Sequence, residues 1–287
     1  MKEIEEILKE NKKLYSSFGL GQVNIQNLLK VLMSYFDVLE AAFNNDKKTF
    51  EKVKFEQIIE KYVHNVTPVV STKTVPYGNI VALTNGNPYI TLELCILAIL
   101  TNNSIIFLNE VDMVHTNQAL IEIIKEFLQK ENKNENQVNF QVIDNFKTIS
   151  QYQDLIDCMI IIGDYDKYHY CSTNMTSKVI FSDYTNINIY TDTDFFDEGI
   201  QFIIEKAAQM DILVYLYRMK DINELLEIEG NNFVFHTTAI YTQDAKEAFT
   251  FIDKIKSKNV YINKNPLETY ALDITEEDLV YHKKIRK

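Results

Sequence analysis

The chain contains no tryptophan and only three cysteines, Cys95, Cys158 and Cys171, with no CxxC pair among them. A disulfide framework needs many paired cysteines and a redox motif needs two close together, so neither is expected. Cys95 and Cys158 lie in apolar runs, which is typical of small core residues in a reducing compartment. The cytoplasm is therefore the predicted location.

Basic residues are also in short supply, with 29 Lys and Arg against 41 Asp and Glu and a formal net charge of −12. A surface of this sign repels phosphates, which argues against nucleic acid and anionic membranes as partners. No apolar run reaches the length of a membrane span, and the first segment, MKEIEEILKENKK, is charged from its start, unlike a signal peptide. The basic tail at 283–287 is interpreted as a solvated terminus.

Metal-binding patterns are missing as well. The five histidines are far apart, without HxH or HExxH spacing, so no zinc site is predicted. The acidic cluster at 192–198 could hold a hard cation, but it lacks the glycine and the spacing of a calcium loop. It is interpreted as the acidic start of a helix, where the helix dipole favours carboxylates.

The clearest positive feature is a βαβ pattern between Pro76 and Glu110. Two short apolar runs, 80–83 and 105–108, have the length of buried parallel strands. Between them, the apolar stretch 91–100 is long enough for about three helical turns. The turn Asn85-Gly86-Asn87-Pro88 lies at the carboxyl end of the first strand and the N-terminus of this helix, where open α/β sheets hold ligands.

The rest of the chain alternates between helix and strand. Helices are expected at 2–15, 24–44, 47–63, 113–131, 149–157, 195–209, near 223–228 and at 243–256, and strands at 138–143, 158–162, 179–181, 187–190, 234–242 and 260–263. This alternation predicts an α/β fold with a doubly wound, mostly parallel sheet that runs through residue 190, followed by a reduced second α/β lobe. Extended segments at 66–75 and 267–285 complete the chain.

Several stretches, taken together and in order, resemble the aldehyde dehydrogenase superfamily, most closely its glutamate-5-semialdehyde dehydrogenase (gamma-glutamyl phosphate reductase) branch. These stretches are Pro76-x-Gly78 with Pro88, Thr91, Glu93 and Asn103; 157–163, a strand ending in glycine; Tyr190-Thr191-Asp192 with Asp194; 236–244, HTTAIYTQD; and 260–263, VYIN.

The resemblance implies three domains. They are N-terminal helices with a dinucleotide-binding-like domain at 1–198, a reduced catalytic-like lobe at 199–265, and C-terminal oligomerisation strands at 266–287. In the resembled family the ribbon before the βαβ unit and the C-terminal strands form an oligomerisation arm. Residues 66–75 and 267–285 fit that arm, so a homodimer through strand addition is predicted.

The chain departs from the family where the chemistry should be. The family's nucleophilic cysteine follows the segment that Tyr190 matches, yet the corresponding region, 207–219, has no cysteine. The chain is also shorter than the family's, and the missing length falls between 197 and 236. A reductase of this class needs a thiolate to form a thiohemiacetal or thioester before hydride transfer. The weak substitute candidate is Cys171, which follows His169 in an expected loop, where the imidazole could lower the pKa of the thiol.

NAD or NADP is the cofactor that the resemblance implies. The candidate binding residues are Thr84, Asn85, Asn87, Pro88, Asn109 and Gly163. Two departures oppose binding: Asn109 and Glu110 stand where the family delivers a Lys or Arg, and Asp164 follows Gly163 where a carboxylate repels pyrophosphate. The amides of Asn85 and Asn87 could orient a polar ligand, or merely cap the following helix.

Three functions stay open. The leading hypothesis is a non-catalytic relative of aldehyde dehydrogenases that binds a small molecule or a partner. The alternative is an NAD(P)-dependent aldehyde, acyl-phosphate or acyl-CoA reductase with an atypical nucleophile. The third is a regulatory subunit that docks on an active paralogue through the arm.

Overall fold

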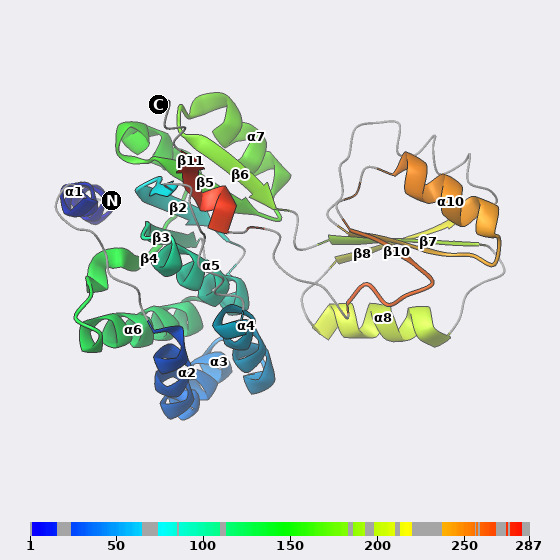
Figure 1. Ribbon diagram of the computed structural model, residues 1–287, viewed down its shortest axis with the longest axis horizontal. Helices are drawn as coiled ribbons and strands as arrows, with labels where there is room; N and C mark the ends of the chain where they lie inside the picture. The colour runs from blue at the N-terminus through cyan, green and yellow to red at the C-terminus, as the bar shows by residue number, and fades with distance from the viewer. Residues whose placement is uncertain are drawn as a thin grey trace, which may run out of the picture. The chain divides into compact units, whose positions relative to one another are not determined.

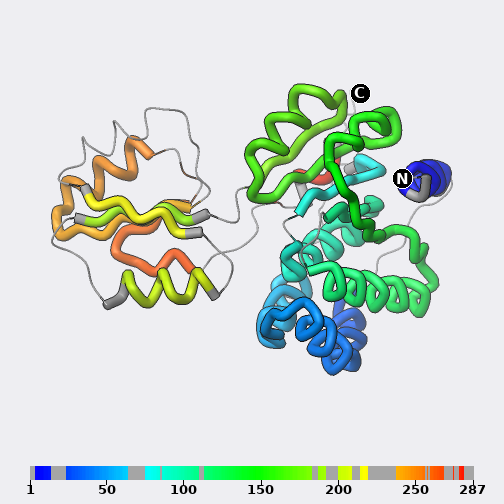
Figure 2. Tube along the Cα trace, turned by 180° about the vertical axis from the view of Figure 1, so that it is seen from behind, coloured from blue at the N-terminus to red at the C-terminus, as the bar shows by residue number. Residues whose placement is uncertain are grey.

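The computed structural model describes residues 2–15, 24–64, 74–84, 86–109, 113–182, 186–192, 198–209, 213–219, 237–255, 257, 259–267, 274 and 276–282. The chain divides into two units. Unit 1 comprises Met1–Phe181 and Ile274–Lys287, and unit 2 comprises Ser182–Asp273. Each unit contains a mainly parallel sheet of its own (Figures 1 and 2).

The sheet of unit 1 has the strand order β4-β3-β2-β5-β6. Its strands are β2 (Asn79–Leu83), β3 (Ser104–Asn109), β4 (Val138–Val142), β5 (Cys158–Ile162) and β6 (Lys178–Ser182). The pairs β2–β3, β3–β4 and β2–β5 are parallel. Every residue of β2, β3 and β5 is buried, because helices cover both faces of a parallel sheet. The predicted βαβ unit and the mostly parallel α/β fold are confirmed.

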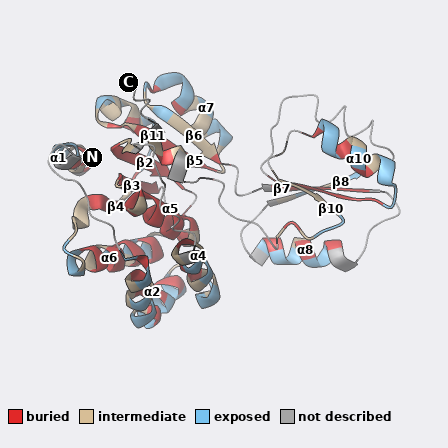
Figure 3. Cartoon of the chain, viewed as in Figure 1, coloured by how far each residue is buried: buried red, intermediate tan, exposed pale blue. Residues whose placement is uncertain are grey.

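Helices α5 (Pro88–Leu100) and α6 (Val114–Lys130) connect β2 to β3 and β3 to β4. Nearly all residues of α5 are buried (Figure 3), which accounts for a helix that is apolar on every side. Its one carboxylate, Glu93, is paired with Lys61 of α4 (Lys52–His64) and accepts a hydrogen bond of 2.9 Å from the Tyr62 hydroxyl. The buried charge is therefore compensated.

A second group of elements packs on the face of the sheet that carries Val81 and Met159. It consists of α1 (Lys2–Tyr15), the 3-10 helix η2 (Phe146–Leu155) and α7 (Tyr165–Asn174), and the short 3-10 turn η1 (Glu135–Gln137) precedes β4. The sequence predicts a loop over α7, and this prediction is wrong. The helix begins because the Asp164 carboxylate caps the Lys167 amide at 2.9 Å, while the polar sequence YDKYHYCSTN hides the helical period.

Helices α2 (Ile25–Ser34), α3 (Phe36–Asn45) and α4 form a further layer against α5 and α6. The predicted single helix over 24–44 is interrupted at Tyr35, which leaves helical geometry at φ −114° and ψ 14°. Its hydroxyl is hydrogen-bonded to Glu126 of α6, so a tertiary contact fixes the break. The helix expected from 47 begins only at Lys52, after Lys47 adopts a left-handed φ of 58°.

At the amino ends of the strands, Asn103 joins three segments. Its Oδ1 accepts from the Gly78 amide at 2.9 Å, and its Nδ2 donates to Thr101 Oγ1 at 2.7 Å and to the Leu279 carbonyl at 2.8 Å. Leu279 ends the C-terminal 3-10 turn η3 (Glu276–Leu279). One side chain thus ties the C-terminal segment to the sheet.

Asn79 makes a similar junction between the sheet and the helices α1 and η2. Its Nδ2 donates to the carbonyls of Leu8 in α1 and Leu155 in η2, at 2.8 and 2.9 Å, and its Oδ1 accepts from Ser104 Oγ at 2.8 Å. The Asn79 amide donates to Asp157 Oδ2 at 2.9 Å. A side chain at Gly78, where φ is 120°, would place a Cβ 2.5 Å from that same oxygen, so only glycine fits.

Unit 2 contains a four-stranded parallel sheet in the order β10-β9-β7-β8. Its strands are β7 (Asn186–Asp192), β8 (Leu213–Met219), β9 (Thr237–Tyr241) and β10 (Asn259–Ile262). Helix α8 (Glu198–Gln209) packs on one face and α10 (Ala245–Lys254) on the other (Figure 1). The helix expected near 223–228 lies outside the described residues.

The boundary between the units differs from the predicted one at residue 198. The sequence assigns the strand at 187–190 to the first sheet, whereas β7 pairs with β8 and β9 in unit 2. The division therefore falls at Ser182, before β7. Apolar residues form a buried strand in either sheet, so local sequence does not decide which sheet a strand joins.

A two-stranded antiparallel ribbon joins distant parts of unit 1. β1 (Thr74–Pro76) pairs with β11 (Val280–His282). The Lys178 ammonium donates to Tyr77 Oη and to the Asp278 carbonyl, each at 2.9 Å, at the base of the ribbon. These strands belong to the two segments predicted to form an arm, of which 65–73, 268–273, 275 and 283–287 lie outside the described residues.

Replacing Asn103 by alanine should destabilise unit 1. The change removes three hydrogen bonds and leaves the buried Gly78 amide without its acceptor, so we expect a loss of roughly 2–4 kcal/mol in the free energy of unfolding. Urea unfolding followed by circular dichroism measures it. Asn44→Ala, on the exposed side of α3, is the matched control and should change stability by less than about 0.5 kcal/mol. Equal effects of both substitutions would contradict the role assigned to Asn103.

Candidate functional site at the carboxyl edge of the first sheet

The structure brings several of the predicted site residues to one edge of the sheet. Thr84 follows β2, Asn109 ends β3 and Gly163 follows β5. The register places Leu83 opposite Leu108 and Ile161, so the three strands end at the same level. The strand order also reverses between β2 and β5, and open α/β sheets bind ligands at such a point. Asn85 lies outside the described residues.

Thr84 and Asn109 are bonded to each other rather than open to a ligand. Both are buried, and their side chains form a hydrogen bond of 3.0 Å. With the Asn109 amide turned to satisfy its surroundings, its nitrogen also donates to the carbonyls of Thr84 and Leu108, each at 3.2 Å. The Asn109 amide thus joins the ends of β2 and β3 by hydrogen bonds inside the protein.

Asn87 and Pro88 form the start of α5. The Asn87 Oδ1 accepts from the amides of Tyr89 and Ile90 at 3.0 and 3.4 Å, and Pro88 at the first helical position has no N–H to offer. Of the two interpretations of the Asn85–Asn87 turn, helix capping is the one that Asn87 follows. The amides that could bind an anion at this helix end are therefore already used.

Asn117 on α6 fixes the turn and was not identified from the sequence. Its Nδ2 donates to the Gly86 carbonyl at 2.6 Å and to the Met113 carbonyl at 2.9 Å. The side chain is fully buried, and its Oδ1 has no hydrogen-bond partner. No local pattern reveals this contact, because Asn117 and Gly86 are 31 positions apart.

The N-terminus of α6 is also capped from a distance. Asp46, at the end of α3, accepts from the His115 amide at 3.3 Å and from the Thr116 amide and hydroxyl at 2.7 Å each. This carboxylate favours the positive end of the helix dipole. It occupies a second helix terminus at which an anion could otherwise bind.

Gly163 adopts a left-handed φ of 69°, which allows the sharp turn from β5 into α7. The next residue, Asp164, caps α7 and lies 3.4 Å from the Lys167 ammonium. The Asp164 carboxylate therefore lies at the N-terminus of α7, the position where a ligand at this edge of the sheet would contact the helix.

The three thiols are buried, and burial raises the pKa of each. Cys95 on α5 has a pKa well above its ordinary value, and the pKa of Cys158 on β5 rises to about 12. Cys171 is only 1% exposed, and burial, together with the Asp164 carboxylate, raises its pKa to about 11. At pH 7 such a thiol is ionised in roughly one molecule in ten thousand.

The environment expected for Cys171 is therefore not found. The sequence suggested a loop and a pKa lowered by His169, whereas the thiol lies on the buried side of α7 against the core. His169 is on the exposed side of the same helix. Residues two positions apart on a helix point in different directions, so the imidazole does not activate this sulfur.

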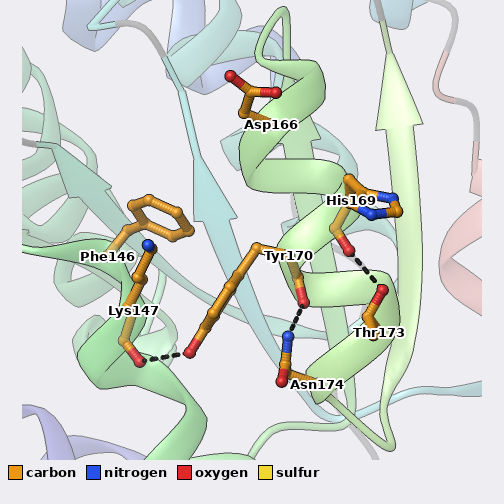
Figure 4. A pocket seen from close by; sticks show the side chains of 7 residues that line it. All are labelled: Phe146, Lys147, Asp166, His169, Tyr170, Thr173 and Asn174. Carbon is orange, nitrogen blue, oxygen red and sulfur yellow. Dashed lines mark hydrogen bonds between the residues drawn. The ribbon is translucent and has the colours of Figure 1, made fainter.

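A groove lies between η2 and α7 (Figure 4). It has a volume of about 460 Å³ and is lined by Phe146, Lys147, Asp166, His169, Tyr170, Thr173 and Asn174. The rings of Phe146 and Tyr170 meet edge to face at 5.4 Å. The Lys147 ammonium lies 5.5 Å from the centre of the Tyr170 ring. Aromatic surface beside a cation and polar groups suits a flat, polar small molecule.

Of the residues singled out from the sequence, His169 is the one that lines the groove. The sequence pattern did not show η2 and α7 as adjacent helices, so Phe146 and Tyr170, 24 positions apart, gave no signal. Gly163 lies directly after β5, at the edge of the sheet. The groove instead lies along α7, the helix that follows Gly163.

Comparisons with known proteins agree with this architecture. The gamma-glutamyl phosphate reductase of Oenococcus oeni is 29% identical over 146 residues, which cover 49% of this chain and 34% of that protein. The crystal structure of the Thermotoga maritima gamma-glutamyl phosphate reductase matches with a TM-score of 0.65 at 15% identity, over 99% of both chains. Substrate-bound AldH of Staphylococcus aureus matches with a TM-score of 0.68 at 12% identity, over 98% of this chain and 93% of that one.

The chain is similar in sequence to gamma-glutamyl phosphate reductases and has the fold of aldehyde dehydrogenases. The sequence match is local, since it spans about a third of the length of the curated gamma-glutamyl phosphate reductases, while the structural match runs across almost the whole of both chains. No protein-family model matches the chain. The fold and the sequence relatives confirm the resemblance stated above.

The described residues do not fit the dinucleotide that the aldehyde dehydrogenase fold implies. A pyrophosphate needs free backbone amides at a helix N-terminus, yet Asn87 occupies those of α5 and Asp46 those of α6. At α7 the Asp164 carboxylate accepts from the Lys167 amide and brings a negative charge to the start of the helix, which disfavours a phosphate there.

Among the described residues, no group of three or more His, Cys, Asp or Glu side chains is arranged to hold a metal ion. None of the helices in the described ranges is long and apolar enough to cross a membrane.

The buried thiols should make the protein less stable in base. Between pH 9 and about 12 the folded chain keeps the Cys158 proton that the unfolded chain loses, so stability is complete below pH 9 and falls as the pH rises. Each such thiol contributes up to about 1.4 kcal/mol per pH unit. Urea unfolding at several pH values should give a shallower decline for Cys158→Ala than for the parent chain.

Met159→Leu, a buried substitution without a titrating group, is the control and should lower stability by a similar amount at every pH.

Chemical labelling of the thiols provides a second check. Ellman's reagent should modify the thiols of the folded chain far more slowly than those of the chain unfolded in guanidinium chloride. A fast-reacting native thiol would show that one of the sulfurs is accessible and contradict the burial described here.

Proposed function

We propose that this chain is a non-catalytic relative of the aldehyde dehydrogenases, a binding or partner protein that keeps their fold. The observation that carries the proposal is the burial of all three cysteine thiols. All three cysteines are buried with raised pKa values, and the region that matches the family's nucleophile segment, 207–219, contains none. Aldehyde chemistry of this family requires a thiolate that can reach the substrate.

The carboxyl edge supports the same proposal. Thr84 and Asn109 bond to each other, the Asn117 Nδ2 donates to the backbone, and Asn87, Asp46 and Asp164 cap the three helices that begin at or near the edge. Polar groups that the protein satisfies internally stabilise the fold and leave little for a phosphate. Among the described residues of unit 1, the groove between η2 and α7 offers aromatic and polar groups to a small molecule.

The second candidate is an NAD(P)-dependent aldehyde, acyl-phosphate or acyl-CoA reductase with Cys171 as an atypical nucleophile. The observation in its favour is that Cys171 lies on α7, the helix that also lines the groove. It would require α7 to move and expose the sulfur. If the non-catalytic chain binds a protein rather than a small molecule, we propose that it is a regulatory subunit of an active paralogue. The proposed location is the cytoplasm for the non-catalytic protein and for the reductase alike.

One experiment separates these functions. The chain is incubated with NADH or NADPH and an aldehyde, an acyl phosphate or an acyl-CoA, and oxidation is followed by absorbance. We expect a rate no higher than that of a heat-denatured sample, and no rise in melting temperature with millimolar dinucleotide. Turnover that Cys171→Ala abolishes, and that Cys158→Ala leaves unchanged, would establish the reductase and overturn the non-catalytic proposal.

We further propose that the chain is a homodimer joined by the arm. The ribbon of β1 and β11 supplies a sheet edge to which a second copy can add a strand. Sedimentation equilibrium should give twice the monomer mass at micromolar concentration. Tyr281→Pro, which removes a backbone donor from β11, should favour the monomer, whereas Tyr281→Ala keeps the donor and should not. A monomer at all concentrations would contradict this assembly.

A further inference from the structure

The groove between η2 and α7 carries two side chains of opposite charge that are not paired with each other. Lys147 belongs to η2 and Asp166 to the first turn of α7, and both are exposed. Within the described part of the chain, the Lys147 ammonium contacts the Tyr170 ring but no carboxylate, and the Asp166 carboxylate is in no ion pair. The neighbouring Lys167, by contrast, lies 3.4 Å from Asp164. Both charges of the groove can therefore interact with a ligand.

Aromatic surface lies beside these charges. The rings of Phe146 and Tyr170 are half-buried and meet edge to face. The Tyr170 hydroxyl donates to the Lys147 carbonyl at 3.5 Å, which holds this ring across the groove from α7 to η2. Figure 4 shows Tyr170 between Asp166 and Asn174 on α7. The groove thus offers an apolar wall to the body of a ligand.

The spacing along α7 sets the size of a ligand that reaches both charges. A helix rises 1.5 Å per residue, so Tyr170 lies about 6 Å beyond Asp166 along the axis, and Asn174 about 12 Å beyond it. The Lys147 ammonium is 5.5 Å from the centre of the Tyr170 ring. Figure 4 shows this ammonium level with Tyr170, one turn away from Asp166. The two charges are therefore separated by at least about one helical turn.

We propose that the groove binds a short peptide of two or three residues with free termini. Its ammonium would lie against Asp166, its carboxylate against Lys147, and an apolar side chain against Phe146 and Tyr170. An extended chain spans about 3.3–3.6 Å per residue, so the termini of such a peptide lie roughly 7–10 Å apart. In a free amino acid the two charges are only about 3 Å apart, too close to reach both side chains.

Other classes of ligand match the groove less well. An aromatic carboxylate leaves Asp166 without a partner, and a phosphate is repelled by Asp166 and by the net charge of −12. Asn174 favours a peptide further: its Nδ2 donates to the Tyr170 carbonyl at 2.8 Å, which leaves Oδ1 to accept from a peptide N–H. The groove volume of about 460 Å³ is of the size that small ligands occupy.

This inference rests on the proposed binding function and names the class of ligand for the groove. The case against catalysis depends instead on the cysteine thiols. Failure to bind a peptide would leave the non-catalytic proposal intact. Reductase turnover would overturn that proposal without deciding whether the groove binds a peptide, because the two measurements are independent.

Nuclear magnetic resonance tests the proposal without any substitution. The full chain, labelled with ¹⁵N, is titrated at low salt with alanyl-phenylalanyl-alanine, and the backbone signals of η2 and α7 are followed. We expect saturable shifts. The same peptide with an acetylated N-terminus and an amidated C-terminus should bind at least about tenfold more weakly, because both ion pairs are lost. Free phenylalanine should also bind more weakly than the tripeptide.

Two variants then assign each end of the peptide. Asp166→Asn should weaken binding of the free tripeptide about three- to fivefold and leave the affinity for the N-acetylated form unchanged, because that form has no ammonium to lose. Lys147→Met should do the same for the free and the C-amidated tripeptide. The matched controls are Asp37→Asn and Lys30→Met, which make the same charge changes at exposed positions of α3 and α2 and should have no effect.

Three results would overturn the proposal. The first is the absence of saturable shifts with the free tripeptide. The second is binding of the doubly blocked peptide, or of benzoate, as tight as that of the free tripeptide; with benzoate, the ligand of the groove would be an aromatic anion instead. The third is an equal effect of the groove variants and their controls. All four substituted side chains are exposed, so the variants should keep the circular dichroism spectrum of the parent chain.

Discussion

The fold of unit 1 depends on a set of side-chain amides at the point where its central strands begin. β2, β3 and β5 are buried on both faces, so backbone groups at their amino ends cannot reach water and must find partners within the protein. Asn103 accepts from the Gly78 amide just before β2, and Asn79 donates from the start of β2 to the carbonyls of Leu8 and Leu155. Through these two residues α1, η2 and the C-terminal segment, which are far apart in the sequence, are fixed to one edge of the sheet.

At the opposite edge of the same sheet, side chains of the protein occupy the positions where a ligand would bind. A parallel sheet directs its carboxyl ends and its helix N-termini to one place, which makes that place suitable for an anion. Here the protein's own acceptors occupy those positions, with Asn87 on α5, Asp46 on α6 and Asp164 on α7. The fold of the aldehyde dehydrogenases is thus present with the start of each of these helices capped by a side chain of the chain itself.

The same closure extends to the sulfur atoms. Cys158 lies within β5 and Cys95 within α5, where the packing that stabilises the sheet also removes solvent from each thiol. Desolvation favours the neutral form and so opposes nucleophilic chemistry. In unit 2 the balance differs, because the α8 face is packed with apolar residues while the α10 face keeps an unpaired amide at Asn188.

The sequence alone determined which segments are buried and in what form. The runs at 80–83, 105–108 and 158–162 predicted β2, β3 and β5, since continuous apolar residues between turns are typical of strands covered on both faces. Their helices followed from length and period. The sequence also placed Thr84, Asn109 and Gly163 correctly at strand ends, and hence at one edge of a parallel sheet. It missed α7, whose polar residues carry no clear helical period.

Only the tertiary structure decided which strands share a sheet and which distant side chains meet. β7 joins unit 2 and not unit 1, and Asn117 reaches Gly86 across 31 positions. Local pattern records the burial of each residue, but pairing between strands of equal apolar character depends on connections and packing that no single segment contains. For the same reason the unpaired state of the Asn188 amide, set by neighbours on two other strands, could not be seen until the sheet was assembled.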